Sequence, residues 1–291
     1  MSDAAAKSLR DALLAEREAV AARYADVLAP DWKSRGVTLA LIAGAVAIYL
    51  FGLIALDISP LRLYNGMAEL IGIIGLMLPP SLHSWAHFWT YLSALGQTLA
   101  IAFLGVLLAA IIGFPLGFLA AKNVVASRIV HFLARRGLDT IRSVDTLVWA
   151  LIWINVVGLG PFAGALAITS ADLGIFGKLF SEAIETADRK PVDGLLATGA
   201  SRLEVIRFGI LPQVLPVFAS QVLYFFESDV RSATIIGIVG AGGIGLYLSE
   251  QIRVLEWQET SFIILMILVT VALIDLISQR LRAAMIGERR S

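Results

Sequence analysis

The feature that most constrains the fold is a set of apolar runs, most of them about long enough to cross a lipid bilayer. Val37 to Leu56 contains 20 residues without a charged side chain, and about 20 helical residues span a hydrocarbon core of about 30 Å. Further runs cover 91–121, 146–157, 162–179, 210–226 and 260–277. In lipid the backbone polar groups must be satisfied internally, which a helix achieves within one segment. The sequence therefore predicts an all-α polytopic membrane protein with about six transmembrane helices.

Composition excludes several other classes of protein. The chain is 58% hydrophobic and only 16% charged, which is more apolar than a soluble domain, and its net charge of zero disfavours a nucleic-acid partner. The absence of cysteine removes disulfides, thiolate nucleophiles and cysteine-based zinc sites. His83 and His87 have a spacing that metal ligands use, but they stand in an aromatic cluster typical of a membrane interface. We therefore expect this chain to bind no metal and no cofactor.

The positions of lysine and arginine predict the orientation of the chain. Twenty of the 23 fall in four segments on one side of the predicted membrane, namely 1–36, 122–142, 178–207 and 280–290. Only Arg62, Arg231 and Arg253 fall elsewhere. Because cytoplasmic loops are enriched in these residues, we expect both termini of this multi-pass membrane protein in the cytoplasm.

The same pattern divides the chain into five parts. They are a cytoplasmic N-terminal segment (1–36), a first transmembrane helix (37–57), an extracytoplasmic segment with an interfacial helix (58–90), a transmembrane core (91–284) and a cytoplasmic tail (285–291). The apolar run from Leu70 to Pro80 is too short to span, so it is the predicted interfacial helix. A further crossing at 232–248 would place the arginine-rich C-terminus outside, so this interval is expected to be re-entrant.

One polar interval, Lys190 to Pro216, interrupts the apolar second half. Pro191 suits the first turn of a helix, Gly199 suits the left-handed residue that ends it, and Ser201 with Glu204 forms a capping box for a second helix. The second helix is expected to run to Gly209, and Pro212 and Pro216 to close the unit. Two short helices cannot bury their own apolar side, so this hairpin needs a partner surface. A DNA-binding helix-turn-helix is disfavoured because no basic stripe accompanies it.

No catalytic motif is present in the sequence. Gly177-Lys178 is followed by Leu179, so the chain lacks the P-loop of an ATPase. The stretch from Gly240 to Gly245 matches G-x-G-x-x-G, but it lies between predicted spans and lacks the βαβ unit of a dinucleotide site. Gly240, Gly242 and Gly243 are instead expected to allow close backbone packing, to form a flexible gate, or both.

Polar residues within the predicted spans are candidates for a path through the bundle. Such residues are Asn155, Gln221 and Tyr224, and Asp275 is a further intramembrane carboxylate. Glu227, Asp229 and Arg231 are expected at the extracytoplasmic end of the fifth span. Their spacing predicts that Glu227 pairs with Arg231 beside the glycine-rich gate and that Asp229 points elsewhere. A local ion pair solvated by headgroups is an equally good interpretation of this trio.

The hairpin resembles the EAA loop of ABC-importer permeases, whose pattern is E-A-A, three residues, G, nine residues and I-x-L-P. Asp193 stands for the Glu, Gly194 and Leu195 replace the alanines, Gly199 matches the G, Gly209 replaces the Ile, and Leu211-Pro212 ends the motif. Segments 157–167, 178–185, 197–216 and 225–245 are similar to phosphonate-importer permeases. The resemblance covers roughly residues 90–284.

This resemblance implies the permease subunit of an ATP-driven phosphonate importer, with alternating access across a bacterial inner membrane. Its expected partners are a second copy of the chain, a cytoplasmic ABC ATPase dimer that binds ATP and Mg, an extracytoplasmic phosphonate-binding protein, and membrane lipid. The residues expected to couple to the ATPase are Asp193, Gly194, Gly199, Ala200, Ser201, Arg202, Glu204, Leu211 and Pro212. The same machinery could carry phosphite, phosphate or another small oxyanion. An ATP-independent carrier or gated channel is the alternative of another class.

Overall fold

The computed structural model describes residues 32–57, 59–125 and 127–287, together with positions 16, 19 and 23. Within these residues the regular elements are all helical, so the predicted fold class is confirmed. Most of the predicted N-terminal segment, and residues 288–291 of the predicted tail, lie outside the described residues. Five described helices are long and apolar enough to cross a membrane, or six if one bent pair counts as a span.

The chain divides into two compact units, 1–71 and 72–291. The first unit contains α3 (Trp32–Ala55), which covers all but the last residues of the predicted first span, and most of α4 (Pro60–Leu76). No residue of α4 is buried, and none of the candidate span Gly36–Ala55 is buried. The prediction placed a short helix at 70–80, whereas the structure has it at Pro60–Leu76, because proline suits the first turn of a helix, as at Pro60, and cannot continue one, as at Pro79-Pro80.

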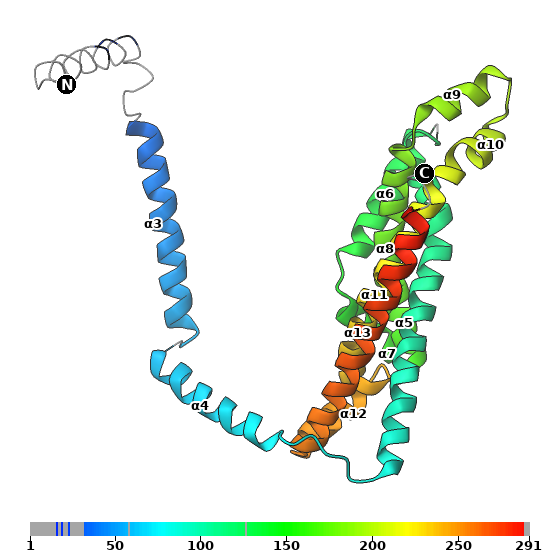
Figure 1. Ribbon diagram of the computed structural model, residues 1–291. Helices are drawn as coiled ribbons and strands as arrows, with labels where there is room; N and C mark the ends of the chain where they lie inside the picture. The colour runs from blue at the N-terminus through cyan, green and yellow to red at the C-terminus, as the bar shows by residue number, and fades with distance from the viewer. Residues whose placement is uncertain are drawn as a thin grey trace, which may run out of the picture. The chain divides into compact units, whose positions relative to one another are not determined.

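The second unit is a helical bundle (Figure 1). Its helices are α5 (Trp85–Ala120), α6 (Arg128–Arg142), α7 (Thr146–Val157), α8 (Pro161–Glu185), α9 (Arg189–Ala197), α10 (Arg202–Glu204), η1 (Val205–Ile210), α11 (Leu211–Ile238), α12 (Ile244–Arg253) and α13 (Trp257–Gly287). The hairpin of α9 and α10 projects at one end of the bundle, and α12 lies at the opposite end. The C-terminal end of α13 lies at the hairpin end.

Helices α5 and α8 pack closely because glycines on α5 face large side chains on α8. A Cβ added at Gly105 would lie 2.7 Å from Ile168 Cβ, and one added at Gly117 would lie 2.7 Å from Phe180 Cβ. Both contacts join residues 63 apart in sequence, so the two helices run parallel. Small residues let transmembrane backbones approach in this way.

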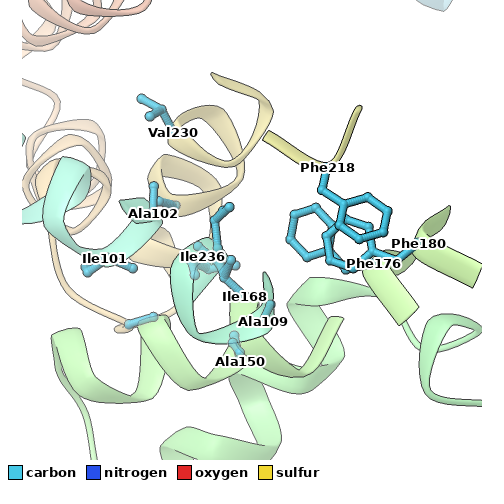
Figure 2. Close-up of a cluster of buried hydrophobic side chains, with 14 of the residues drawn as sticks. Ile101, Ala102, Ala109, Ala150, Ile168, Phe176, Phe180, Phe218, Val230 and Ile236 are labelled. Carbon is cyan, nitrogen blue, oxygen red and sulfur yellow. The ribbon is translucent and has the colours of Figure 1, made fainter. Parts of the chain in front are cut away.

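The core contains stacked phenylalanines where α8 meets α11 (Figure 2). The ring centroids of Phe180 and Phe218 are 4.1 Å apart, and those of Phe176 and Phe225 are 5.1 Å apart. In these pairs the residue number rises along α8 as it falls along α11, so these two helices are antiparallel. Aromatic pairs of this kind contribute about 0.5–1.5 kcal/mol beyond the area they bury.

Two predicted boundaries differ from the structure. The fifth span was expected to end at Phe226, but α11 continues to Ile238. The charged residues beyond Phe226 find partners inside the bundle, as described below, so they do not end the helix. Residues 232–238 therefore belong to α11 and not to a separate re-entrant segment, and α12 follows after a five-residue connection.

Candidate functional site

The hairpin has the local geometry that the sequence predicts. Gly199 has φ +82° between α9 and α10. The backbone N–H of Ser201 donates to Glu204 Oε2 at 2.7 Å, and the backbone N–H of Glu204 donates to Ser201 Oγ at 3.5 Å. Both bonds of the capping box are thus present. Asp188, which the sequence analysis did not single out, is the N-cap of α9 and accepts from the backbone N–H of Lys190 at 3.1 Å.

The base of the hairpin is attached to α11 by Gln213. Its Nε2 donates to the carbonyl oxygens of Gly209 and Asp188 at 2.6 and 3.2 Å, and its Oε1 accepts from the Asp188 backbone N–H at 2.9 Å. Gly209 also leaves room for α9, because an added Cβ would lie 3.1 Å from Leu195 Cδ1. The contact spans 25 residues of sequence, so only the folded hairpin reveals the role of Gln213.

The prediction that Gly209 ends the second helix is wrong. Residues 205–210 form a π-helical turn that leads directly into α11. Pro212 lies in the first turn of α11 and Pro216 lies inside it. A proline is tolerated in a first helical turn, where its missing N–H would have no intrahelical partner. The hairpin and α11 are therefore one continuous helical arm.

The tip of the hairpin exposes apolar side chains. Leu203 is 77% exposed and Leu196 is 53% exposed. The predicted coupling residues Asp193, Gly194 and Arg202 are exposed beside them. Apolar side chains gathered on a projecting, otherwise polar surface are typical of a protein contact. Coupling of these residues to an ATPase stays a prediction.

Glu227 and Arg231 of α11 pair with residues of α13 and not with each other. Arg282 Nη2 lies 2.8 Å from Glu227 Oε2, and Arg231 Nη1 lies 3.7 Å from Asp275 Oδ1. The predicted Glu227–Arg231 pair is therefore wrong, because α13 supplies an opposite charge to each residue across the helix interface. Arg231 is the looser partner, with a side chain that is 51% exposed. Arg282 was missed because it lies beyond the predicted last apolar run (260–277), in the basic segment 280–290 that was expected on the cytoplasmic side.

The remaining path candidates have mixed environments. Asn155 Nδ2 donates to the carbonyl of Leu151 on its own helix at 2.8 Å. Gln221 Oε1 is buried and has no hydrogen-bond partner among the described residues. Tyr224 is exposed, with an edge contact to Phe225. Asp229 is buried beside Asp172 of α8.

The glycine-rich connection packs against α5 and against the start of α8. Gly240, Gly242 and Gly243 all have positive φ. The backbone N–H of Gly243 donates to Gln97 Oε1 at 2.9 Å, and a Cβ added at Gly242 would lie 2.9 Å from the Pro161 backbone nitrogen. Close backbone approach therefore requires glycine here, as one of the two interpretations predicted. A gating role stays a prediction.

Glu259 is a functional candidate that the sequence did not identify. Its carboxylate is 1% exposed and accepts from the His83 backbone N–H at 3.0 Å and from Tyr91 Oη at 2.7 Å. The Nδ1 atoms of His83 and His87 lie 2.9 and 2.8 Å from Glu259 Oε1. The histidines thus help join the start of α5 to the start of α13 across more than 170 residues of sequence. Among the residues that the structure describes, no group of three or more ligating side chains could hold a metal ion.

Comparison with known proteins settles the family. A family model described as a binding-protein-dependent transport system inner membrane component matches residues 113–287, more than half of the chain. The chain belongs to this family of ABC-importer permeases. ATP hydrolysis in such an importer takes place on a separate subunit, and a binding protein delivers the substrate.

Several curated relatives are permeases for phosphorus oxyanions. The phosphite transport system permease protein PtxC of Stutzerimonas stutzeri is 34% identical over 86% of this chain and 89% of its own length. HtxC of the same organism, a permease assigned provisionally to phosphite transport, is 40% identical over 79% of this chain and 80% of its own. The phosphate-import permease protein PhnE of Mycolicibacterium smegmatis is 31% identical over 86% of this chain and 46% of its own.

A solved structure of the MetNI methionine ABC transporter in inward-facing conformations has the same fold. Its matching chain aligns with a TM-score of 0.61 at 19% identity, covering 69% of this permease and 99% of that chain. The identity is too low to carry over a substrate. The fold and the family together favour an importer permease over the ATP-independent carrier or channel that the sequence left open.

Proposed function

We propose that this permease forms the membrane part of an importer for small phosphorus oxyanions, phosphonates in particular. Phosphonate, phosphite and phosphate share a tetrahedral phosphorus that bears negatively charged oxygens. The relatives are named as permeases for different members of this group of anions, which supports phosphorus oxyanions as the substrate class. Half-exposed Arg231, loosely paired at 3.7 Å with Asp275, supports it further, because a cation inside a membrane protein is costly and marks ion pathways.

The observation that carries the proposal is the continuity of the hairpin with α11. The capping box and Gln213 give the hairpin a fixed shape, and its exposed Leu196 and Leu203 provide an apolar contact surface. A push on this surface moves α11 as well, since η1 joins them without a break. Glu227, Asp229 and Arg231 lie on α11. Closure of an ATPase pair would therefore displace intramembrane charges and switch the access of the path.

The proposed assembly contains two copies of the chain, one hairpin for each subunit of a cytoplasmic ATPase dimer that binds ATP and Mg. A cavity of about 460 Å³ beside α9 and η1 includes Lys122, Arg189 and Arg202 in its lining, and these cations suit acidic groups of the ATPase. The hairpin and the C-terminal end of α13 lie at one end of the bundle (Figure 1). This arrangement supports placing the C-terminus in the cytoplasm together with the hairpin.

Reconstituted uptake tests the proposal. The permease, its ATPase and its binding protein are placed in liposomes, and entry of labelled methylphosphonate is measured with phosphite, phosphate or sulfate as competitor. We expect uptake that requires ATP and the binding protein, that phosphite or phosphate reduces, and that sulfate leaves unchanged. Phosphite that competes more strongly than unlabelled methylphosphonate would assign the importer to phosphite. Uptake by the permease without the ATPase would contradict the proposal and support a carrier or channel.

A further inference from the structure

Two carboxyl groups face each other in the middle of the bundle. Asp172 stands one turn before Phe176 on α8, and Asp229 stands one turn after Phe225 on antiparallel α11. Because Phe176 and Phe225 are in contact, the next turn along each helix brings the two aspartates together. Their side chains lie within hydrogen-bonding reach of each other. The pair is eleven residues from the start of α8 and thirteen from its end.

Both groups are almost completely removed from solvent. Asp172 is 3% exposed and Asp229 is 6% exposed. Within the described part of the chain, no N–H or O–H group donates to Oδ2 of either residue. A buried carboxylate with an unsatisfied oxygen is costly, and two facing carboxylates repel each other. Such a pair is stable only when something positive is bound between or beside them.

The helices around the pair do not supply that charge. Helices α5 and α7 contain no aspartate, glutamate, lysine or arginine. On α8 itself, Lys178 bonds to Asp139 of α6 at 3.0 Å. Helix α6 contains four arginines. Arg135 lies 3.4 Å from Glu185, and Arg136 lies 3.6 Å from Asp139. The other two, Arg128 and Arg142, are exposed.

The cations of α11 and α13 are engaged elsewhere or, in the case of Arg280, exposed. Arg231 is close enough to act on Asp229, but its guanidinium contacts Asp275 at 3.7 Å. Arg282 is held by Glu227 at 2.8 Å. The Ser232 hydroxyl lies within hydrogen-bonding reach of Asp229, but a neutral group cannot cancel a second negative charge.

We propose that Asp172 and Asp229 bind a single proton between them, so that the acid O–H of one donates to the carboxylate of the other. This hydrogen bond fastens α11 to α8 at the centre of the bundle. Two carboxyls that share one proton form a familiar and strong arrangement in protein interiors. The site goes beyond the proposed function, since it does not depend on which anion is carried.

The proton links packing to transport. Helix α11 continues the coupling hairpin, so movement of the hairpin acts on the Asp172–Asp229 contact. Loss of the proton at alkaline pH would leave two facing charges and push α11 away from α8. Uptake is therefore expected to fall at alkaline pH, and an amide in place of either carboxyl removes that fall because it donates an N–H that does not titrate.

Infrared spectroscopy of the full-length permease with its ATPase in lipid nanodiscs tests the site directly. At neutral pH we expect the carbonyl stretch of a protonated buried carboxyl in the wild type. The band should disappear in Asp172→Asn and in Asp229→Asn and persist in Asp275→Asn, whose carboxylate faces Arg231. No such band in the wild type, or a band that survives in both variants, would overturn the proposal. If a variant fails to fold, the wild-type spectrum alone tests the proposal. The band in that spectrum does not depend on which anion the permease carries.

The pH profile of uptake provides the second readout. Asp172→Asn and Asp229→Asn should each lose the alkaline decline that the wild type shows, whereas Asp275→Asn should keep it. Unchanged decline in both variants would contradict a shared proton. Uptake that depends on sodium in the wild type and not in the variants would show that the pair binds a metal cation. That result would also overturn the shared proton.

Discussion

At the scale of single residues, the ion pairs between α11 and α13 differ in what their loss should cost. The Glu227 and Arg282 side chains are 14% and 20% exposed and their contact is 2.8 Å, so removing one leaves a nearly buried charge. Arg282→Ala should therefore destabilise the permease by about 3 kcal/mol. Thermal unfolding in detergent measures this effect. Glu227→Ala combined with Arg282→Ala should recover much of the loss, and additive losses would show that the residues do not interact.

Arg231 is expected to matter for transport more than for stability. Its side chain is half-exposed and its contact with Asp275 is long, and an exposed ion pair contributes about 0–1 kcal/mol. Arg231→Ala should thus lower the initial uptake rate with little change in unfolding temperature. Arg253→Ala is the matched control, because Arg253 is another arginine outside the four segments assigned to the cytoplasmic side. Equal uptake by the two variants, with equal amounts of assembled complex, would leave Arg231 a surface charge.

At the scale of elements, the corner between α9 and α10 decides whether the hairpin can act as a rigid arm. Gly199 has φ +82°, and a β-branched residue in this region costs on the order of 1 kcal/mol or more. Gly199→Val should leave membrane insertion intact but abolish ATPase stimulation by the binding protein, because the angle between the two helices changes. Steady-state ATPase assays with and without binding protein measure it.

The control for this substitution is a glycine with ordinary backbone geometry. Gly137 lies in α6, and an added Cβ would meet nothing within 4 Å. Gly137→Val should keep normal stimulation, apart from a small change in helix propensity. Normal stimulation in Gly199→Val would show that the hairpin corner does not transmit the signal.

At the scale of the whole molecule, the charge distribution predicts the orientation of the chain. Since 20 of the 23 lysines and arginines fall in four segments assigned to one side, both termini should lie in the cytoplasm. A reporter enzyme that is active only outside the cytoplasm should be silent when fused after residue 291 and active when fused after residue 75. The reverse pattern would place the hairpin outside, where no ATPase could reach it.

The sequence by itself determined what depends on neighbours along the chain. Apolar runs predicted the helices because hydrophobic length decides what can span lipid, and Ser201, Glu204 and Gly199 predicted the hairpin because caps and corners are formed within a few residues. Only the tertiary structure decided which distant residues meet. It paired Glu227 with Arg282, placed Asp172 against Asp229, and brought His83 to Glu259, because helix packing sets these contacts across 55 or more residues. The continuation of α11 past Phe226 was missed for the same reason: its charges are tolerated only because other helices supply their partners.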